Sequence, residues 1–265
     1  MNKTFSTEFV FELFALLIAI IIVHAVYVLL VWPNAEAAMT EMLSRIRSEP
    51  NYIPQRSFWV LLKDYEQESC IILMFWALSI MGYKARTATR ERAMLGRDLV
   101  PIAEGMRILP DDARAYSRQI ETLPESERNL LLPRTLLSAV QRFGATRNIQ
   151  DVSAATHTMV TSEAERLESE LSMLRYVLWA IPCIGFIGTV RGISDALALA
   201  YRAAEGDLTG VTDKLAVGFN STLIALIINI FLMFLVHQLQ LVQERMVFDT
   251  EGYLDEHLIR HLQAD

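Results

Sequence analysis

The sequence predicts an all-α integral membrane protein with four transmembrane helices and long helices that extend into a cytoplasmic helical domain. Three observations predict this fold. The 265 residues are 52% hydrophobic and have a mean hydropathy of +0.28, which is unusual for a water-soluble domain. Two stretches stay apolar over about 20 residues, the length of a membrane span. Residues 86–148 show helical spacing of apolar residues and no strand-like alternation.

Two spans are long enough to cross a bilayer on their own. An α-helix rises 1.5 Å per residue, so roughly 20 residues cover a hydrocarbon core of about 30 Å. Leu13–Trp32 has 20 residues, with His24 as its only group that ionises near neutral pH. Leu215–Val236 has 22 residues and no charged side chain. We therefore expect the first and fourth transmembrane helices here.

Two shorter stretches are candidates for the second and third spans. Residues 69–83 and 176–190 each contain 15 uncharged residues, or about 22 Å of helix. They can still span, because Lys84 and Arg175 at their ends can extend their charges to the membrane surface. Buried or interfacial helices are the alternative interpretation.

The distribution of positive charge predicts the orientation. Residues 84–174 hold 13 of the 24 lysines and arginines, against four in 33–68. Because positive residues accumulate on the cytoplasmic side, the long segment and both termini are expected inside. The expected domains are the N-terminal segment with the first span (1–32), a periplasmic loop (33–68), the second span (69–85), a cytoplasmic helical domain (86–174), the third and fourth spans (175–236) and a cytoplasmic C-terminal helix (237–265).

The cytoplasmic segments are expected to be helical throughout. Proline and acidic residues mark the starts of short helices: Pro101, Pro110, Asp111, Asp112, Pro124, Glu125 and Pro133. Beyond them, an apolar heptad seam predicts one helix that enters the third span without a break: Val160, Ala164, Leu167, Leu171, Leu174 and Leu178. The seam serves either packing within the chain or self-assembly. Residues 238–262 predict a second helix that runs back along the first.

The third span carries a stripe of small residues. Gly185, Gly188, Thr189 and Gly192 follow the spacing i, i+3, i+4 and i+7, which places them on one face of a helix. Such a stripe allows close helix packing, and a hydroxyl on it also suits an ion path. Both interpretations stay open from this pattern.

The fourth span adds polar residues. Asn220, Ser221 and Thr222 occur together, and Asn229 follows seven residues after Thr222, on much the same face. Polar groups in hydrocarbon are costly unless they are paired or line water. The middle of each predicted span lacks Asp and Glu. A proton that crosses here would therefore need a carboxylate from another chain.

The motif of the third span resembles a known family. The run EAERLESELSMLRYVLWAIPCIGFIGTVRGI, residues 163–193, is similar to the MotA/TolQ/ExbB proton-channel family. The residues that fill the family's span motif are Pro182, Gly185, Gly188, Thr189, Val190 and Gly192. Residues 210–226 resemble the next span of the family, with Thr222 at its central threonine, and the C-terminal run LVQERMVFDTEGYLDEHLIRHL resembles its closing helix. The topology is closest to MotA, and the motifs to TolQ and ExbB.

The resemblance implies a motor subunit of the bacterial inner membrane. It implies a homopentamer around two copies of a single-span MotB/TolR/ExbD-type partner, whose membrane aspartate carries the ion. Thr189 and Thr222 would be the hydroxyls that face this aspartate, with Ser221 and Asn229 along the ion path. Pro182, Gly185, Gly188, Gly192 and Ala225 would form the pore face or pack the partner. The resemblance implies H⁺ as the ion. Arg191 and Ala225 depart from the family pattern, so Na⁺ stays an alternative.

Other functions are less well supported by the sequence. We find no phosphate loop, nucleophile elbow or metal cluster, so we expect no enzyme activity, cofactor or metal site. A net charge of −7 argues against a nucleic acid partner, and the expected surroundings are membrane lipid. The alternative function is a non-conducting membrane scaffold that uses the same helix faces only for packing.

Several single residues have two interpretations. His24 is expected to bond to a neighbouring helix, with a proton relay as the alternative. His257 and His261 are expected to be solvated or at a helix end rather than metal ligands. Arg191 is expected to pair with Asp195 one turn later, or to bind lipid phosphate. The two cysteines, Cys70 and Cys183, are expected to pack as small apolar residues within spans.

Overall fold

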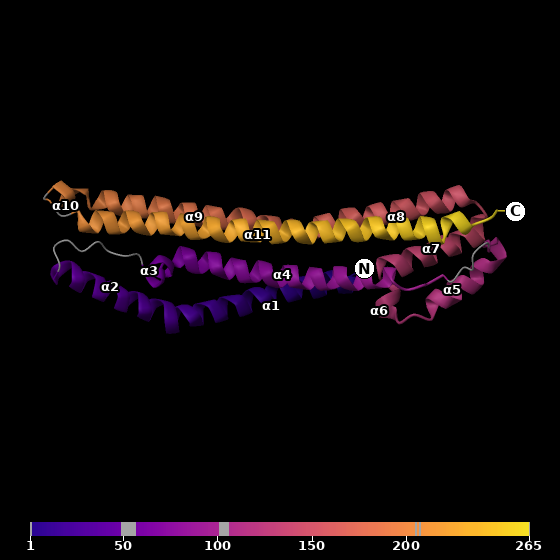
Figure 1. Cartoon of the computed structure of the whole chain (residues 1–265), viewed down its shortest axis with the longest axis horizontal. Helices are drawn as coiled ribbons and strands as arrows, with labels where there is room; N and C mark the ends of the chain where they lie inside the picture. Colours follow the sequence, from indigo (N-terminus) through magenta and orange to yellow (C-terminus); the bar gives the residue numbers. More distant parts are fainter. Residues whose placement is uncertain (1, 49–56, 101–105, 205, 207, 265) are drawn as a thin grey trace. The chain divides into compact units, whose positions relative to one another are not determined.

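The computed structural model confirms the all-α fold. It describes residues 2–48, 57–100, 106–204, 206 and 208–264, and within these ranges helices dominate and no strand forms (Figure 1). One isolated parallel β-bridge joins Ile108 to Leu262. Among the described residues, four helices are long and apolar enough to cross a membrane: Glu8–Ile46, Tyr65–Leu95, Ile149–Ala198 and Gly210–His261. The chain divides into two compact units, of residues 1–82 with 173–236 and of residues 83–172 with 237–265.

The first unit, which we call the membrane unit, contains the apolar parts of all four long helices. Its elements are α1 (Asn2–Val26), a π-helical turn (Tyr27–Val31), α2 (Trp32–Ser48), α3 (Phe58–Leu62), the first part of α4 (Tyr65–Leu95), α9 (Ser172–Ala198), α10 (Ala200–Ala204) and the first part of α11 (Thr209–His257). We use the name loop end for the end of this unit where α3 precedes α4 and where α9 and α11 are joined.

The first helix continues past its predicted end at Trp32. Helical geometry runs from α1 through the π-helical turn into α2, which ends at Ser48. The Trp32 N–H bonds to the carbonyl of Tyr27, five residues back, and so widens the turn just before Pro33. Proline has no N–H, and its ring would clash with the carbonyl four residues earlier in a regular helix. The wider turn accommodates Pro33 and lets the helix continue.

Much of the predicted periplasmic loop 33–68 is helical in the structure. α2 and α3 occupy much of it, and α4 begins at Tyr65, four residues before the predicted span. Residues 49–56 of the predicted loop lie outside the described residues. Glu66 and Glu68 stand in the first turn of α4, where the helix dipole favours a negative charge. Which side of the membrane this segment faces stays a prediction.

The second unit, which we call the helical unit, contains the short helices that the prolines predicted. Its elements are the end of α4, a 3₁₀ turn (Pro110–Asp112), α5 (Ala113–Glu121), α6 (Glu125–Arg128), α7 (Leu131–Thr146), α8 (Ile149–Glu170), the end of α11 and a 3₁₀ turn (Ile259–His261). Pro110 begins its turn, Pro124 caps α6, and Pro133 lies in the first turn of α7. Pro101, also predicted as a boundary, lies outside the described residues.

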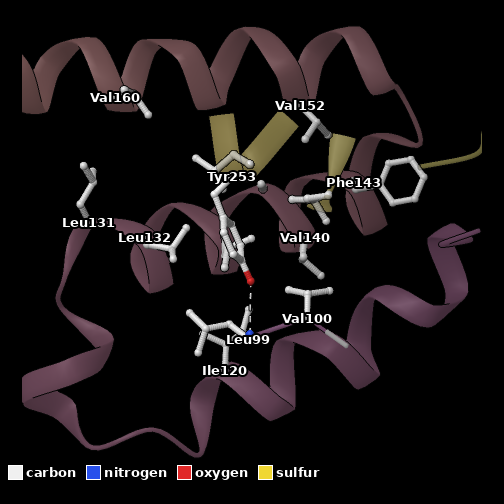
Figure 2. Packing of buried hydrophobic residues seen from close by; sticks show 14 of the residues in the cluster. Leu99, Val100, Ile120, Leu131, Leu132, Val140, Phe143, Val152, Val160 and Tyr253 are labelled. Carbon is white, nitrogen blue, oxygen red and sulfur yellow. Dashed lines mark hydrogen bonds between the residues drawn. The ribbon is translucent and has the colours of Figure 1, made fainter. Parts of the chain in front are cut away.

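The helical unit has its own hydrophobic core. Phe143 and Leu136 of α7, Val152 of α8 and Leu254 of α11 are fully buried in one cluster. Figure 2 shows Tyr253 reaching from α11 into this cluster. Its hydroxyl accepts the N–H of Leu99 at 3.3 Å and donates to the carbonyl of Arg97 at 3.2 Å. The buried tyrosine therefore has its polar atom satisfied, as an apolar core requires.

The two long predicted helices form, with one irregularity. α8 and α9 follow each other and differ from one continuous helix only at Leu171, where the backbone stays right-handed helical. The predicted seam is buried at Val160, Leu171 and Leu174, whereas Ala164 and Leu167 are only partly buried. Packing within the chain thus accounts for most of the seam. α11 continues over 49 residues, and beside α8 it buries the predicted apolar side of the C-terminal helix.

The helical unit also buries carboxylates in two different environments. Glu91, on the part of α4 beyond the apolar span, accepts the N–H of Leu131 at 2.8 Å. Burial raises the pKa of Glu91 to about 7; the bond from Leu131 opposes this effect, and the nearby charge of Glu163 adds to it. Burial also acts on Glu163, but hydrogen bonds from Arg166 and Arg134 outweigh it and hold the pKa of that carboxyl below its usual value.

We predict that Glu91→Gln reduces the loss of stability toward neutral pH. The raised pKa of Glu91 means that the folded chain keeps a proton that the unfolded chain has lost above about pH 4.5. Stability should therefore fall as pH rises from about 4.5 to about 7, by at most about 3 kcal/mol. Glutamine keeps an oxygen for the Leu131 N–H but cannot ionise. Thermal unfolding of the detergent-solubilised protein at about pH 5 and about pH 8 measures the difference. Equal pH dependence in both proteins would contradict the prediction.

Candidate functional site

The small stripe of α9 packs against α11, side by side with it in the membrane unit (Figure 1). A Cβ at Gly192 would lie 2.7 Å from both the Gly218 N and the Lys214 O. A Cβ at Gly185 would lie 2.5 Å from the Ala225 Cβ. Because real Cβ contacts are wider, only glycine lets the two backbones come this close. The stripe therefore serves helix packing within the chain.

This close approach brings the two predicted threonines together. The hydroxyl oxygens of Thr189 and Thr222 are in direct hydrogen-bond contact. Thr189 Oγ1 also lies 3.1 Å from the carbonyl oxygen of Gly218, and Thr222 Oγ1 lies 2.9 Å from that of Gly185. Each hydroxyl is thus within reach of the other helix's backbone and of the other hydroxyl. Both side chains are only partly buried.

The hydroxyl pair has more acceptors than protons. Thr189 and Thr222 supply two hydroxyl protons for four contacts. These are the bond between the hydroxyls, the two carbonyl bonds above, and a longer contact of 3.4 Å from Thr189 Oγ1 to the Gly185 oxygen. When one hydroxyl donates to the other, one of the two carbonyls loses its bond. The pair therefore has two alternative proton arrangements of similar geometry. Such a pair can pass a proton or solvate a cation without moving a helix.

Two further predicted site residues, Ser221 and Ala225, lie in the contact between α9 and α11. Ser221 is fully buried, touches the position of a Cβ at Gly188, and donates to the carbonyl of Val217 at 2.9 Å. Ala225 is fully buried against Gly185. Ser221 and Ala225 thus contribute to the packing of α9 against α11.

Two predicted residues lie apart from the threonines. Asn229 is about 10 Å along α11 from Thr222 at the helical rise, and its buried Oδ1 has no hydrogen-bond partner among the described residues. Pro182 lies inside α9, and the neighbouring carbonyl of Ile181 is 3.7 Å from the Cys70 Sγ. The structure therefore brings neither residue to the hydroxyl pair.

Arg191 has a different partner from the one that the sequence predicted. Its guanidinium lies 2.8 Å from Glu66 Oε2, not against Asp195. Asp195 instead pairs with Lys214 of α11 at 3.4 Å, and both side chains of that pair are about half exposed. The predicted pair of Arg191 with Asp195 was wrong because the first turn of α4 brings a more buried carboxylate to the arginine. The hypothesis that Arg191 binds lipid phosphate is not tested.

Sequence reasoning missed Glu66 and Glu68, which it assigned to a loop. The Glu66 side chain lies within 3.2 Å of where a Cβ of Gly188 would be, and Glu68 Oε1 is 2.7 Å from His24 Nδ1. The sequence did contain a signal for these two glutamates. The predicted second span covered only about 22 Å of a core of about 30 Å. An extension of that span toward its N-terminus would have included both glutamates.

Part of the chain matches a known protein family. Residues 127–251, just under half of the chain, match the profile of the MotA/TolQ/ExbB proton channel family. This stretch of the chain therefore carries the sequence pattern of the family. The match includes both threonines and confirms the resemblance of the two spans. No curated protein and no solved structure matches the chain at a significant level. The similarity to this proton-channel family, together with the four apolar helices among the described residues, indicates a multi-pass membrane protein, and the family implies a proton-channel, energy-transducing function.

We predict that Gly192→Ala destabilises the membrane unit, whereas Gly82→Ala does not. The new methyl at position 192 must displace the backbone of α11, and overpacking of this kind costs about 1–3 kcal/mol. A methyl at Gly82 meets nothing within 4 Å, and alanine favours a helix more than glycine does. The melting temperature in detergent should fall for the first variant only. Equal melting temperatures for the two variants would contradict the close approach of α9 and α11.

Proposed function

We propose that this chain is the channel subunit of a proton-driven motor in the bacterial inner membrane. Five copies surround two copies of a single-span MotB/TolR/ExbD-type partner, both chain termini are cytoplasmic, and ion flow drives movement of the partner. Na⁺ is the second candidate ion. The proposal includes no catalytic activity and no bound cofactor. One observation carries it, namely the contact between the hydroxyls of Thr189 and Thr222 inside the apolar part of the bundle.

The chemistry of the hydroxyl pair supports an ion path. The pair has two proton arrangements, and its oxygens can accept as well as donate. A simple packing contact needs no hydroxyls, because glycine, alanine and valine pack helices at no desolvation cost. Two facing threonines at the closest approach of two spans are therefore better explained by a transported ion.

The lack of a carboxylate at the hydroxyls supports a partner protein. No carboxylate is hydrogen-bonded to Thr189 or Thr222 among the described residues. The carboxylate nearest along the stripe, Glu66, is held by Arg191 at 2.8 Å. A proton that crosses hydrocarbon needs a titrating group to carry it. A membrane aspartate on a second chain meets this need and agrees with the family.

One observation favours a second candidate, a non-conducting scaffold. Gly185, Gly188 and Gly192 all face side chains or backbone of the same chain, so packing explains the stripe by itself. A scaffold of this kind needs the glycines but not the hydroxyls. The two candidates therefore differ in what happens when only the hydroxyls are removed.

We predict that Thr189→Val and Thr222→Val abolish proton flux and leave assembly intact. Valine keeps the shape of threonine but removes the hydroxyl, and loss of a proton-transfer group typically costs a factor of about 10² or more. Proton uptake into liposomes that contain the complex with its partner measures the effect. Thr189→Ser and Thr222→Ser are the matched controls, since each keeps a hydroxyl and should conduct. Normal flux in both valine variants would favour the scaffold.

We also predict the composition of the complex. Native mass spectrometry of the chain alone should show five copies, and co-expression with a single-span protein encoded beside it should add two copies of that protein. A monomer or dimer in both preparations would contradict the motor.

A further inference from the structure

The loop end of the membrane unit holds a histidine–carboxylate pair that the hydroxyl path does not use. His24 of α1 and Glu68 of α4 are 44 residues apart in sequence, and His24 Nδ1 lies 2.7 Å from Glu68 Oε1. The Glu68 side chain is 8% exposed, whereas the His24 side chain is 56% exposed. One member of the pair is thus accessible from outside the bundle and the other is inside it.

The chemistry of the pair allows one proton to lie on either group. A buried carboxylate beside a neutral imidazole would carry an uncompensated negative charge, which an apolar interior strongly disfavours. A proton on His24 gives a compensated ion pair, and a proton on Glu68 gives a neutral hydrogen-bonded pair. Transfer between the two states breaks the bond of hydrogen to Nδ1 and forms one to Oε1. The net charge of the pair does not change in this step.

A second ion pair also uses a carboxylate from the first turn of α4, and it lies close to the hydroxyl path. Glu66, two residues before Glu68, pairs with Arg191 of α9 and packs against Gly188. Gly188 immediately precedes Thr189 in the chain. Unlike the histidine pair, this pair has a cation that cannot lose its proton near neutral pH. Of the two pairs, only that of His24 and Glu68 thus has a cationic partner that can exchange its proton.

Buried polar atoms at the same place point to a further ligand. The Tyr27 side chain is 2% exposed, and its hydroxyl has no hydrogen-bond partner among the described residues. This hydroxyl is close enough to Glu68 and Asp64 to interact with both electrostatically. Asp64 Oδ2 and the fully buried Gln67 Oε1 lack partners in the described part of the chain as well. A tyrosine hydroxyl and acceptor oxygens without partners suit a proton carried by water.

The surrounding groups define the charge of the site. Two aromatic rings contact each other beside His24, those of Tyr27 and Trp32, and the Trp32 Nε1–H donates to the Lys63 carbonyl at 3.0 Å. The charged groups that act on Asp64 are Lys63, beside it between α3 and α4, Glu66 of α4, Arg191 of α9 and Lys214 of α11. Lys63, Arg191 and Lys214 are permanent cations, and they outnumber Asp64 and Glu66, the carboxylates of this set. A metal cation would meet these positive charges, whereas a proton needs only the imidazole and the carboxylate.

We propose that His24 and Glu68 form the site that takes up the proton at the loop end, with Tyr27 and Asp64 as its buried polar neighbours. His24 accepts the proton from water, and Glu68 holds it inside the bundle next to the Glu66–Arg191 pair. The inference rests on the proposed function, because it supplies the proton that the threonine pair passes on. It assigns the chain's own carboxylate a role before the partner's aspartate.

Proton flux in liposomes that contain the complex tests this site. His24→Gln and Glu68→Gln each remove one titrating group and keep a hydrogen-bonding side chain, so flux should fall by about tenfold or more. Asp195→Asn is the matched control, because it removes the half-exposed ion pair with Lys214 at the same end of the unit and should leave flux unchanged. The interchanged variant, His24→Glu with Glu68→His, keeps one imidazole and one carboxylate and should restore flux.

The outcomes separate this inference from the proposed function. Normal flux in His24→Gln and Glu68→Gln, in a complex that Thr189→Val inactivates, would overturn the uptake site and leave the motor. Normal flux in Thr189→Val would overturn both. Where a single variant fails to assemble by native mass spectrometry, the interchanged variant decides. Restored flux supports the uptake site, and an interchanged complex that assembles without flux, or fails to assemble, shows that the pair is only structural.

Discussion

The close approach of α9 and α11 is the constraint on which the rest of the membrane unit depends. At Gly192 the facing backbone leaves no room for a Cβ, and Gly185 is limited in the same way by Ala225. A methyl at either position would lie 2.5–2.7 Å from atoms of α11, so the two helices would have to move apart. The contact between the hydroxyls of Thr189 and Thr222 exists only at this separation. The close packing that the glycines allow therefore also brings together the two hydroxyls of the proposed proton path.

Different kinds of polar group occupy different positions along the membrane unit. Hydroxyls occupy the middle of the α9–α11 contact, where a charge would be most costly. Charged side chains gather at the loop end, where Glu66 pairs with Arg191 and Glu68 with His24. The first pair contains a permanent cation, whereas the second contains an imidazole. Both pairs take their carboxylate from the first turn of α4.

The helical unit follows different rules because its core is built like that of a water-soluble protein. Its short helices bury one cluster around Phe143 and Tyr253, and the long helices α8 and α11 contribute to the same cluster (Figure 2). The apolar seam of α8 is largely used inside the chain, which leaves its partly buried residues, Ala164 and Leu167, for any contact between copies. Buried Glu91 shows that this unit, too, holds a carboxylate whose charge depends on pH.

The sequence by itself determined the four spans, the helical fold and the two threonines, because hydrophobic length and helical periodicity are local properties of a chain. It also predicted the family, since its motif occupies consecutive turns of one helix. Only the tertiary structure decided that Arg191 pairs with Glu66 rather than Asp195, and that His24 meets Glu68. These partners are 125 and 44 residues apart, and no local pattern encodes which helices lie side by side. Likewise, the continuation of the first helix past Trp32 depended on a wide turn that local propensity does not favour.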